Sequence, residues 1–146
     1  MELLDSREAV TDLVLDLLAE PELRDGGSVG IVLQAYLCDS PQLLDRVLAW
    51  ARETPRAAPL VVRLVKGAYW DHEVVEARQH GWRAPVFEAK AQCDRNFEAL
   101  TARLLEARPL VRVAVASHNL RSVAHAVAVS RRLGAPDADL ERQEPA

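Results

Sequence analysis

VVRLVKGAYW, residues 61–70, is the stretch that decides the fold. It begins as an apolar, β-branched run, which favours a buried β-strand, yet Arg63 stands in the middle of that run. Because an unpaired charge inside a core is very costly, we expect the Arg63 guanidinium to face a ligand near the open end of the strand. Gly67 follows four residues later, after Lys66, and would let the backbone approach that ligand closely. The stretch therefore predicts a strand that ends in a binding site.

Strands and helices alternate on both sides of this stretch. Apolar runs predict two further strands, at residues 29–37 and 111–116. Apolar residues at helical spacing predict helices over residues 3–18, 40–52, 72–79, 94–106 and 120–133. Ser40, followed by Pro41, is expected to be the N-cap of the second of these helices.

This alternation of strands and helices is typical of βαβ units with right-handed crossovers. We therefore predict an α/β fold with about three parallel strands and flanking helices. Nothing in the sequence marks an internal repeat or a second domain, so residues 1–136 are expected to form one domain. The polar residues 137–146 are expected to fray as a C-terminal tail.

The composition excludes several classes of function. The chain has 146 residues, is 49% hydrophobic, and carries a net charge of -4, which offers no basic face for nucleic acid. No apolar run is long enough to span a bilayer. The two cysteines show no CxxC spacing, and the histidines show no metal-ligand spacing with them. We expect a cytoplasmic protein that binds neither nucleic acid nor a metal.

Polar residues stand at or just beyond the end of each predicted strand: Gln34, then Arg63, then Ser117-His118-Asn119. Parallel α/β folds bind their ligands at the carboxyl ends of strands, so we expect these residues to share one site. Plainer alternatives exist, in which Gln34 bonds a neighbouring loop and Arg63 forms a structural salt bridge with Glu73.

Three segments resemble a known family. Residues 63–71, RLVKGAYWD, resemble the signature strand of the proline dehydrogenases, particularly the bacterial type fused to a second dehydrogenase; VLQAYL at 32–37 and ASHN at 116–119 lie at the family's spacing. The resemblance implies oxidation of L-proline to 1-pyrroline-5-carboxylate by hydride transfer to FAD. It also implies a (β/α)₈ TIM-type barrel, of which this chain matches only the middle part.

The resemblance further implies partners and a location. Reduced FAD would pass its electrons to a membrane quinone, which could place the protein at the inner face of the cell membrane. A pyrroline-5-carboxylate dehydrogenase, attached or separate, would use the product.

Residue roles follow from the resemblance as well. Arg63 would be the catalytic residue, donating a hydrogen bond to the flavin nitrogen that receives hydride, and Tyr69 would lie nearest the substrate. The positions that would contact FAD are Met1, Gln34, Arg63, Val65, Gly67, Ala68, Tyr69, Trp70, Lys90, Ser117, His118 and Asn119. For Lys90 the alternative is an ordinary exposed lysine, and for the two aromatics a hydrophobic plug. Glu88 departs from the hydroxyl residue common in the family.

The match leaves parts of the family pattern unaccounted for. The family's acidic residue before its Met-Glu pair would precede Met1, and its paired substrate-binding arginines would follow Ala146. We therefore expect a fragment of the full enzyme. One alternative is a non-catalytic remnant that binds flavin weakly or not at all. Another is an unrelated (β/α)₈ enzyme in which Lys66 forms a Schiff base.

Overall fold

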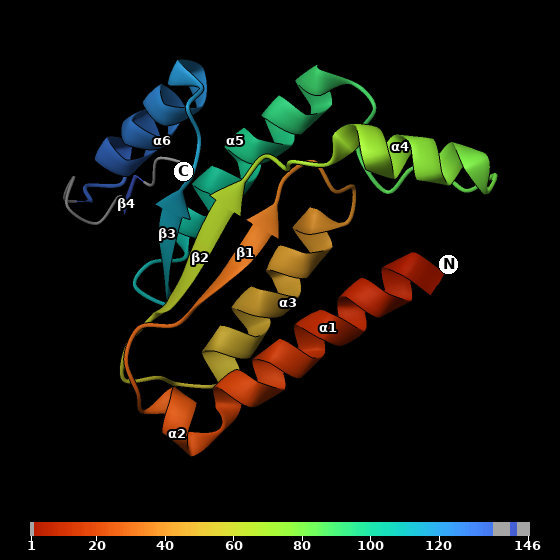
Figure 1. The fold of residues 1–146 in the computed structure, drawn as a ribbon. Coiled ribbons are helices and arrows are strands. Elements are labelled where there is room, and N and C mark those ends of the chain that lie inside the picture. Colours follow the sequence, from red (N-terminus) through yellow and green to blue (C-terminus); the bar gives the residue numbers. More distant parts are fainter. Residues whose placement is uncertain (1, 136–140, 143–146) are drawn as a thin grey trace.

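A computed structural model of the chain describes residues 2–135 and 141–142, with side chains from residue 9 to residue 135. The elements along the chain are α1 (Glu2–Ala19), α2 (Pro21–Arg24), β1 (Gly30–Gln34), α3 (Ser40–Glu53), β2 (Leu60–Val65), α4 (Trp70–Gln79), α5 (Lys90–Glu106), β3 (Val111–Val115), α6 (Leu120–Arg132) and β4 (Glu141–Arg142) (Figure 1).

The strands form one parallel sheet in the order β1-β2-β3-β4. Val32 on β1 lies beside Arg63 on β2, which in turn lies beside Ala114 on β3. The α/β prediction with three main parallel strands is thus confirmed. The short strand β4 was not foreseen, because it lies in the predicted tail and its two polar residues carry no apolar strand pattern. The remaining residues of that tail lie outside the described part of the chain.

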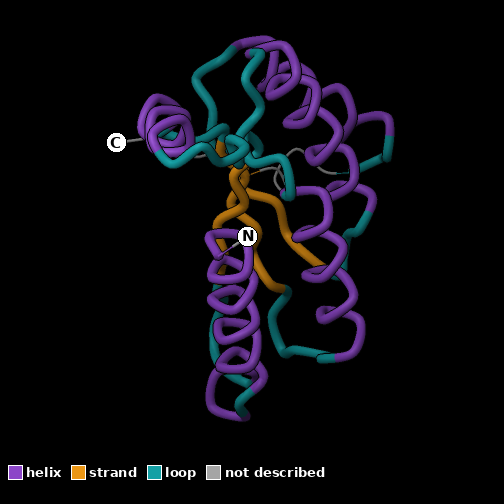
Figure 2. The backbone as a smooth tube through the Cα atoms, turned by 90° about the vertical axis from the view of Figure 1, so that its right-hand side faces the viewer, coloured by secondary structure: helices purple, strands orange, loops and turns teal. Residues whose placement is uncertain are grey.

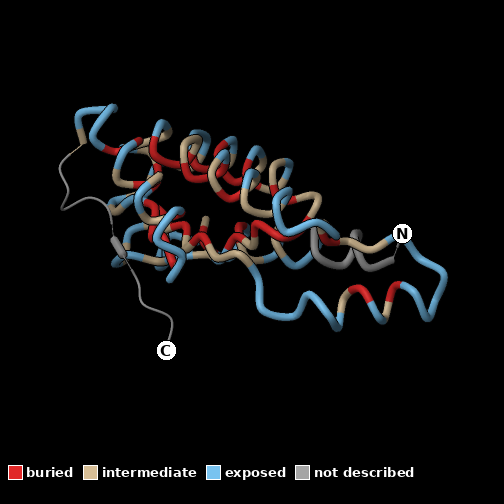
Figure 3. Tube along the Cα trace, turned by 90° about the horizontal axis from the view of Figure 1, so that it is seen from above, coloured by how far each residue is buried: buried red, intermediate tan, exposed pale blue. Residues whose placement is uncertain are grey.

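Helices cover one face of this sheet. Leu33, Leu64 and Val115 point to that face and are buried against the helices in the main hydrophobic core. Helices α3 and α5 supply the opposing layer, and the two facing sides appear as the buried residues between the layers in Figure 3. Helices on a single face of a parallel sheet are the arrangement of a barrel wall, where the helices form the outer ring.

The other face of the sheet is largely open. It carries the alternate residues of the strands, among them Val32, Arg63 and Arg112. The side chain of Val32 is 54% exposed although valine is a strongly apolar residue. In a closed barrel this face would line the interior, which side chains from the other strands fill.

Helix α1 lies at the β1 edge of the sheet. In Figure 2 it is the helix that begins at N, and it stands in front of the strands. Within α1, Leu15 and Leu18 are buried, whereas Val10, Leu13 and Leu17 are exposed. The amphipathic helix expected from the sequence is present, but only part of its apolar surface is covered.

Several helix starts differ from the prediction: α1 begins one residue early, at Glu2, and α4 begins two residues early, at Trp70. Asp39 is the N-cap of α3, and Ser40 is instead its first residue, with a buried hydroxyl that donates a hydrogen bond to the Leu37 carbonyl at 2.8 Å. Helix α5 begins at Lys90, four residues before the predicted Asp94. Its first turn is exposed or half-buried, so the apolar periodicity that marks a helix in the sequence starts only at Phe97.

Candidate functional site

The structure brings the polar strand ends to one edge of the sheet. Gln34, the last residue of β1, lies beside Val65, the last residue of β2. Backbone pairing continues past β3, since the Ala116 amide donates to the Leu64 carbonyl at 3.0 Å. Ser117 follows directly, so the candidate residues of the three strands meet at the same carboxyl edge.

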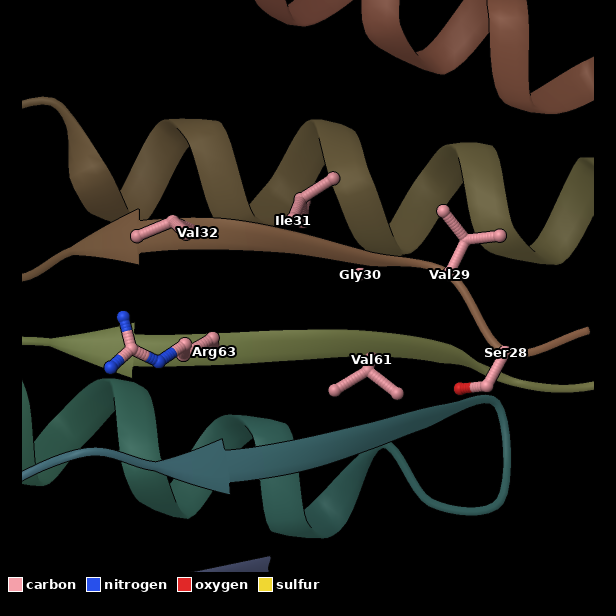
Figure 4. A pocket seen from close by; sticks show the side chains of 7 residues that line it. All are labelled: Ser28, Val29, Gly30, Ile31, Val32, Val61 and Arg63. Carbon is pink, nitrogen blue, oxygen red and sulfur yellow. The ribbon is translucent and has the colours of Figure 1, made fainter. Parts of the chain in front are cut away.

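Arg63 lies on the open face of the sheet. It is half-buried and lines a cavity of about 350 Å³ that runs along β1 and β2. Figure 4 shows its guanidinium extending along β2 toward the carboxyl end of the strand, beside the side chain of Val32. The charge is therefore kept out of the packed core, as the sequence predicted, and is directed toward the edge where the strands end.

A second cavity, of about 310 Å³, lies just beyond this edge. Three residues of the predicted site line it, namely Gly67, Trp70 and Lys90, together with Tyr36, Lys66, Phe87, Glu88 and Cys93. Its walls thus combine aromatic rings with two lysines. Burial raises the pKa of the Cys93 thiol, which keeps the cysteine in its neutral form at this wall.

Gly67 is required by the protein's own packing as well as by any ligand. Its φ is +129°, a value that residues with a side chain rarely adopt. A Cβ at this position would lie 2.4 Å from the ring of Tyr36. The close approach expected from the sequence is therefore made to the Tyr36 ring, which in turn forms part of the cavity wall.

The aromatic residues after β2 have different environments. The Trp70 indole donates to the Phe87 carbonyl at 2.8 Å, and the Phe87 amide donates to the Tyr36 carbonyl at 2.8 Å. These two bonds fasten the segment before α5 across the cavity. Tyr69, by contrast, is 69% exposed, so it is not a hydrophobic plug.

Asp94 joins the two lysines of the cavity. One carboxylate oxygen accepts from Lys66 at 2.5 Å, and the other accepts from Lys90 at 2.7 Å. The Lys66 ammonium also lies 5.6 Å from the centre of the Phe97 ring. These hydrogen bonds, the one from Lys66 foremost, lower the pKa of Asp94. The ion pair accounts for Lys66 and offers no support for a Schiff-base role.

The ion pairs of Asp94 predict a pH-dependent stability. The pKa of Asp94 in the folded chain lies below the value of about 3.9 for an unfolded Asp. The ion pairs of Asp94 therefore stabilise the folded state above about pH 4, and this stabilisation is lost as the pH falls through the folded-state pKa. We expect Asp94→Asn to lower the free energy of unfolding by about 1 kcal/mol at neutral pH, and the difference from wild type to shrink in acid. Urea unfolding at a series of pH values measures it; a pH-independent difference would contradict the role of the charge.

The residues after β3 serve the start of α6. Asn119 is the N-cap, and its side-chain oxygen accepts from the amides of Arg121 at 3.0 Å and Ser122 at 3.3 Å. The Ser117 hydroxyl accepts from the Asn119 amide at 3.2 Å, and His118 is exposed. Both short polar residues thus have structural contacts in addition to the predicted contact with a cofactor.

The cap at Asn119 yields a prediction of its own. Asn119→Ala removes the acceptor for two amides of the first turn of α6, so we expect a loss of about 1 kcal/mol in the free energy of unfolding. Asn119→Asp retains a capping oxygen and should stay close to wild type. Thermal unfolding of the two variants measures this, and equal loss in both would argue against the cap.

Two residues that support the site, Asp94 and Asn96, were not predicted from the sequence. Asp94 could have been found only in part, since its spacing of four from Lys90 suggests a helical ion pair, but its contact with Lys66 depends on the fold. Asn96 donates to the Ala35 carbonyl and to the Ser40 hydroxyl, both at 2.8 Å, and so ties α5 to the end of β1. Met1, which was predicted to contact the cofactor, lies outside the described residues.

Within residues 2–135 and 141–142, no helix combines the length and the apolar character that crossing a membrane requires. Across that same part of the chain, His, Cys, Asp and Glu side chains do not gather in groups of three that could hold a metal ion.

Known proteins are similar to the chain in both sequence and fold. The family model for proline dehydrogenase matches residues 1–144. The bifunctional protein PutA of Escherichia coli (strain K12) is 36% identical over 121 residues, which are 82% of this chain and 9% of that protein. The hydroxyproline dehydrogenase of Bos taurus is 36% identical over 109 residues, 70% of this chain and 23% of that enzyme.

A solved structure matches in the same way. The crystal structure of PutA from Bdellovibrio bacteriovorus inactivated by N-propargylglycine superposes with a TM-score of 0.89 at 40% identity, covering 92% of this chain and 14% of that one. The chain spans 9% and 23% of the length of the two relatives named above and 14% of this structure, and its fold is part of a TIM-type barrel. The matched family, the sequence identities and the superposition agree, and the chain belongs to the proline dehydrogenase family.

Proposed function

We propose that this chain carries the cofactor side of an active site that oxidises L-proline to 1-pyrroline-5-carboxylate with FAD. The observation that carries the proposal is the position of Arg63, whose guanidinium lies on the open sheet face and points to the edge where Gln34 and Ser117 also lie. Family membership supports the reaction, since the matched family is that of proline dehydrogenase.

The residues present fit a flavin with a diphosphate tail. The open face carries the Arg63 guanidinium and the Gln34 amide near the strand ends. The neighbouring cavity has aromatic walls together with Lys66 and Lys90. FAD, when bound, would accept the hydride from the substrate. Arg63 would then donate a hydrogen bond to the ring and stabilise the negative charge that reduction places there.

The other residues would bind and orient. The Gln34 amide can both donate and accept at a ring edge, and Lys90 would reach the phosphates. Exposed Tyr69 would meet the substrate. The remaining contacts with the cofactor would be made by Met1, Val65, Gly67, Ala68, Trp70, Ser117, His118 and Asn119.

We further propose that residues 1–136 are one part of a larger barrel, followed by the short tail 137–146. The exposed apolar side chains of α1 and of Val32 on the open sheet face support this, because further strands and helices of a closed barrel would cover them. A quinone at the inner face of the membrane would accept the electrons. A pyrroline-5-carboxylate dehydrogenase, attached or separate, would take the product, in line with the word bifunctional in the name of the PutA relatives.

A second candidate function is flavin binding without catalysis. It is favoured by the same uncovered surfaces, since the substrate side of the site needs residues from other parts of a barrel. The two candidates share the cofactor contacts and differ only in whether proline reduces the bound flavin.

The visible absorption spectrum of FAD separates these possibilities. Added FAD is expected to show the spectral shift of a bound flavin, and anaerobic L-proline is expected to bleach it. Hydroxyproline is the comparator substrate, because the Bos taurus relative is named for it. Binding without bleaching would support the non-catalytic candidate, and a spectrum identical to that of free FAD would contradict both.

An arginine on the neighbouring strand provides a matched control. Arg112 on β3 lies beside Val61 and faces the same side of the sheet as Arg63, but farther from the carboxyl edge. We expect Arg63→Met to weaken FAD binding about 10- to 100-fold, the effect of losing a hydrogen bond from a charged group. Arg112→Met should bind FAD as wild type does, and equal losses in both variants would argue against a specific role for Arg63.

A further inference from the structure

Asp94 forms ion pairs with both lysines of the cavity, Lys66 and Lys90. We propose that Asp94 is a positioning residue, which holds Lys66 and Lys90 where they can bind the diphosphate of the cofactor. This inference rests on the proposed function, because it assigns the way in which the anionic part of the ligand is recognised.

The geometry of the Lys66–Asp94–Lys90 cluster carries the proposal. Lys66 follows β2, Lys90 begins α5, and the Asp94 carboxylate lies one helical turn after Lys90, with one oxygen on each ammonium at 2.5 and 2.7 Å. Both lysines line the cavity beside Gly67, whereas Asp94 itself does not. The carboxylate thus contacts both cations without itself lining the cavity.

The carboxylate is also well held. The Asp94 side chain is only 17% exposed, and it connects the end of the central strand to the first two turns of α5. A lysine has a long flexible side chain that loses considerable freedom when it is fixed. A fixed carboxylate between two lysines sets the ammonium groups in place before an anion arrives, which reduces the entropy lost on binding.

The sign of the expected effect separates positioning from simple charge. Removing a negative charge next to an anion site strengthens anion binding if only Coulomb attraction acts. If Asp94 acts by fixing the lysines, its removal weakens anion binding instead. Asp94→Asn keeps the size of the side chain and removes the charge, so the two explanations give opposite results for the same variant.

Glu98 supplies a control on the same helix. Its side chain is 19% exposed and pairs with Arg121 at 2.7 Å, so Glu98→Gln removes an ion-paired carboxylate that is about as buried as that of Asp94. Neither residue lines the cavity. A loss of binding that came only from a weakened helix would appear in both variants, whereas a positioning role would appear in Asp94→Asn alone.

The test uses two probes. Inorganic pyrophosphate is titrated into the flavin-free chain and followed by the NMR amide signals of Lys66, Gly67 and Lys90. We expect Asp94→Asn to bind it about tenfold more weakly than wild type, the size of one displaced charge-assisted hydrogen bond. FMN differs from riboflavin by one phosphate, so the ratio of their affinities reports on phosphate binding. We expect this ratio to be lower for Asp94→Asn than for wild type. Asp94→Glu should recover part of both, and Glu98→Gln should match wild type.

The outcomes are distinct from those of the proposed function. Pyrophosphate binding by Asp94→Asn that equals or exceeds wild type would overturn the proposal, and so would a wild-type chain that binds no pyrophosphate. Asp94→Ser takes the place of Asp94→Asn if the latter does not fold, with the same expectation. If Asp94→Asn binds pyrophosphate more weakly than wild type but the wild-type chain binds no FAD, the positioning role of Asp94 stands and the proposed function is rejected. If the wild-type chain binds FAD but Asp94→Asn leaves the ratio of FMN to riboflavin affinity unchanged, the proposed function stands and the positioning role of Asp94 is rejected.

Discussion

Gly67→Ala is expected to lower the free energy of unfolding by about 3 kcal/mol. Two effects add at this position. A residue with a side chain is strained at a φ of +129°, and the new Cβ would lie 2.4 Å from the buried ring of Tyr36. Neither partner can move easily, because the Tyr36 carbonyl accepts from Phe87 and its amide donates to the Lys66 carbonyl, both at 2.8 Å. Urea unfolding measures the loss.

Gly81 is the matched control for this substitution. Its φ of +67° is also positive, but a Cβ there would have no atom within 4 Å. Gly81→Ala therefore tests the backbone strain without the clash and should cost about 1 kcal/mol. If the two variants lose the same amount of stability, the contact with Tyr36 has no energetic weight and the account of Gly67 is wrong.

Phe97→Ala is expected to cost about 4 kcal/mol of unfolding free energy, a large part of the total for a domain of this size. Phe97 is fully buried in the main core, where α5 meets the sheet. Its ring also lies under the Lys66 ammonium at 5.6 Å. Truncation would leave a cavity in the core and remove the aromatic surface beneath that lysine.

Two further variants separate these effects. Phe97→Leu retains most of the apolar volume and should cost less than about 1.5 kcal/mol, while still removing the ring beneath Lys66. Leu120→Ala, at an exposed position on α6, should stay within about 0.5 kcal/mol of wild type. Calorimetric unfolding of the three variants checks the order; a Phe97→Ala loss as small as that of Leu120→Ala would contradict the placement of Phe97 in the core.

The main strands could be predicted because their apolar, β-branched runs are a local signal. The carboxyl-edge position of Gln34, Arg63 and Ser117 followed from that prediction, since parallel strands end at a common edge. The charge of Arg63 was informative for the same reason: a cation in an apolar strand needs an exit from the core, and the open face provides it.

Features that depend on tertiary contacts could not be predicted. The Tyr36 ring against Gly67 joins residues 31 positions apart in the sequence, and the Lys66–Asp94 pair joins residues 28 positions apart. Strand β4 was missed because two residues are too few to show a period. The N-cap of α3 was wrongly assigned to Ser40, because the Ser40 hydroxyl donates to the Leu37 carbonyl instead of accepting from a first-turn amide, and Asp39 is the N-cap.

The central claim is that the ends of β1, β2 and β3 form one flavin site, and NMR mapping of FAD binding tests it most directly. We expect FAD to shift the backbone amide signals of Gln34, Arg63, Gly67 and His118 together. Thr54 and Leu110 should stay unmoved, because they line a separate cavity with Leu60, at the opposite end of the strands. Shifts confined to Thr54 and Leu110, or shifts at none of these residues at saturating FAD, would contradict the claim.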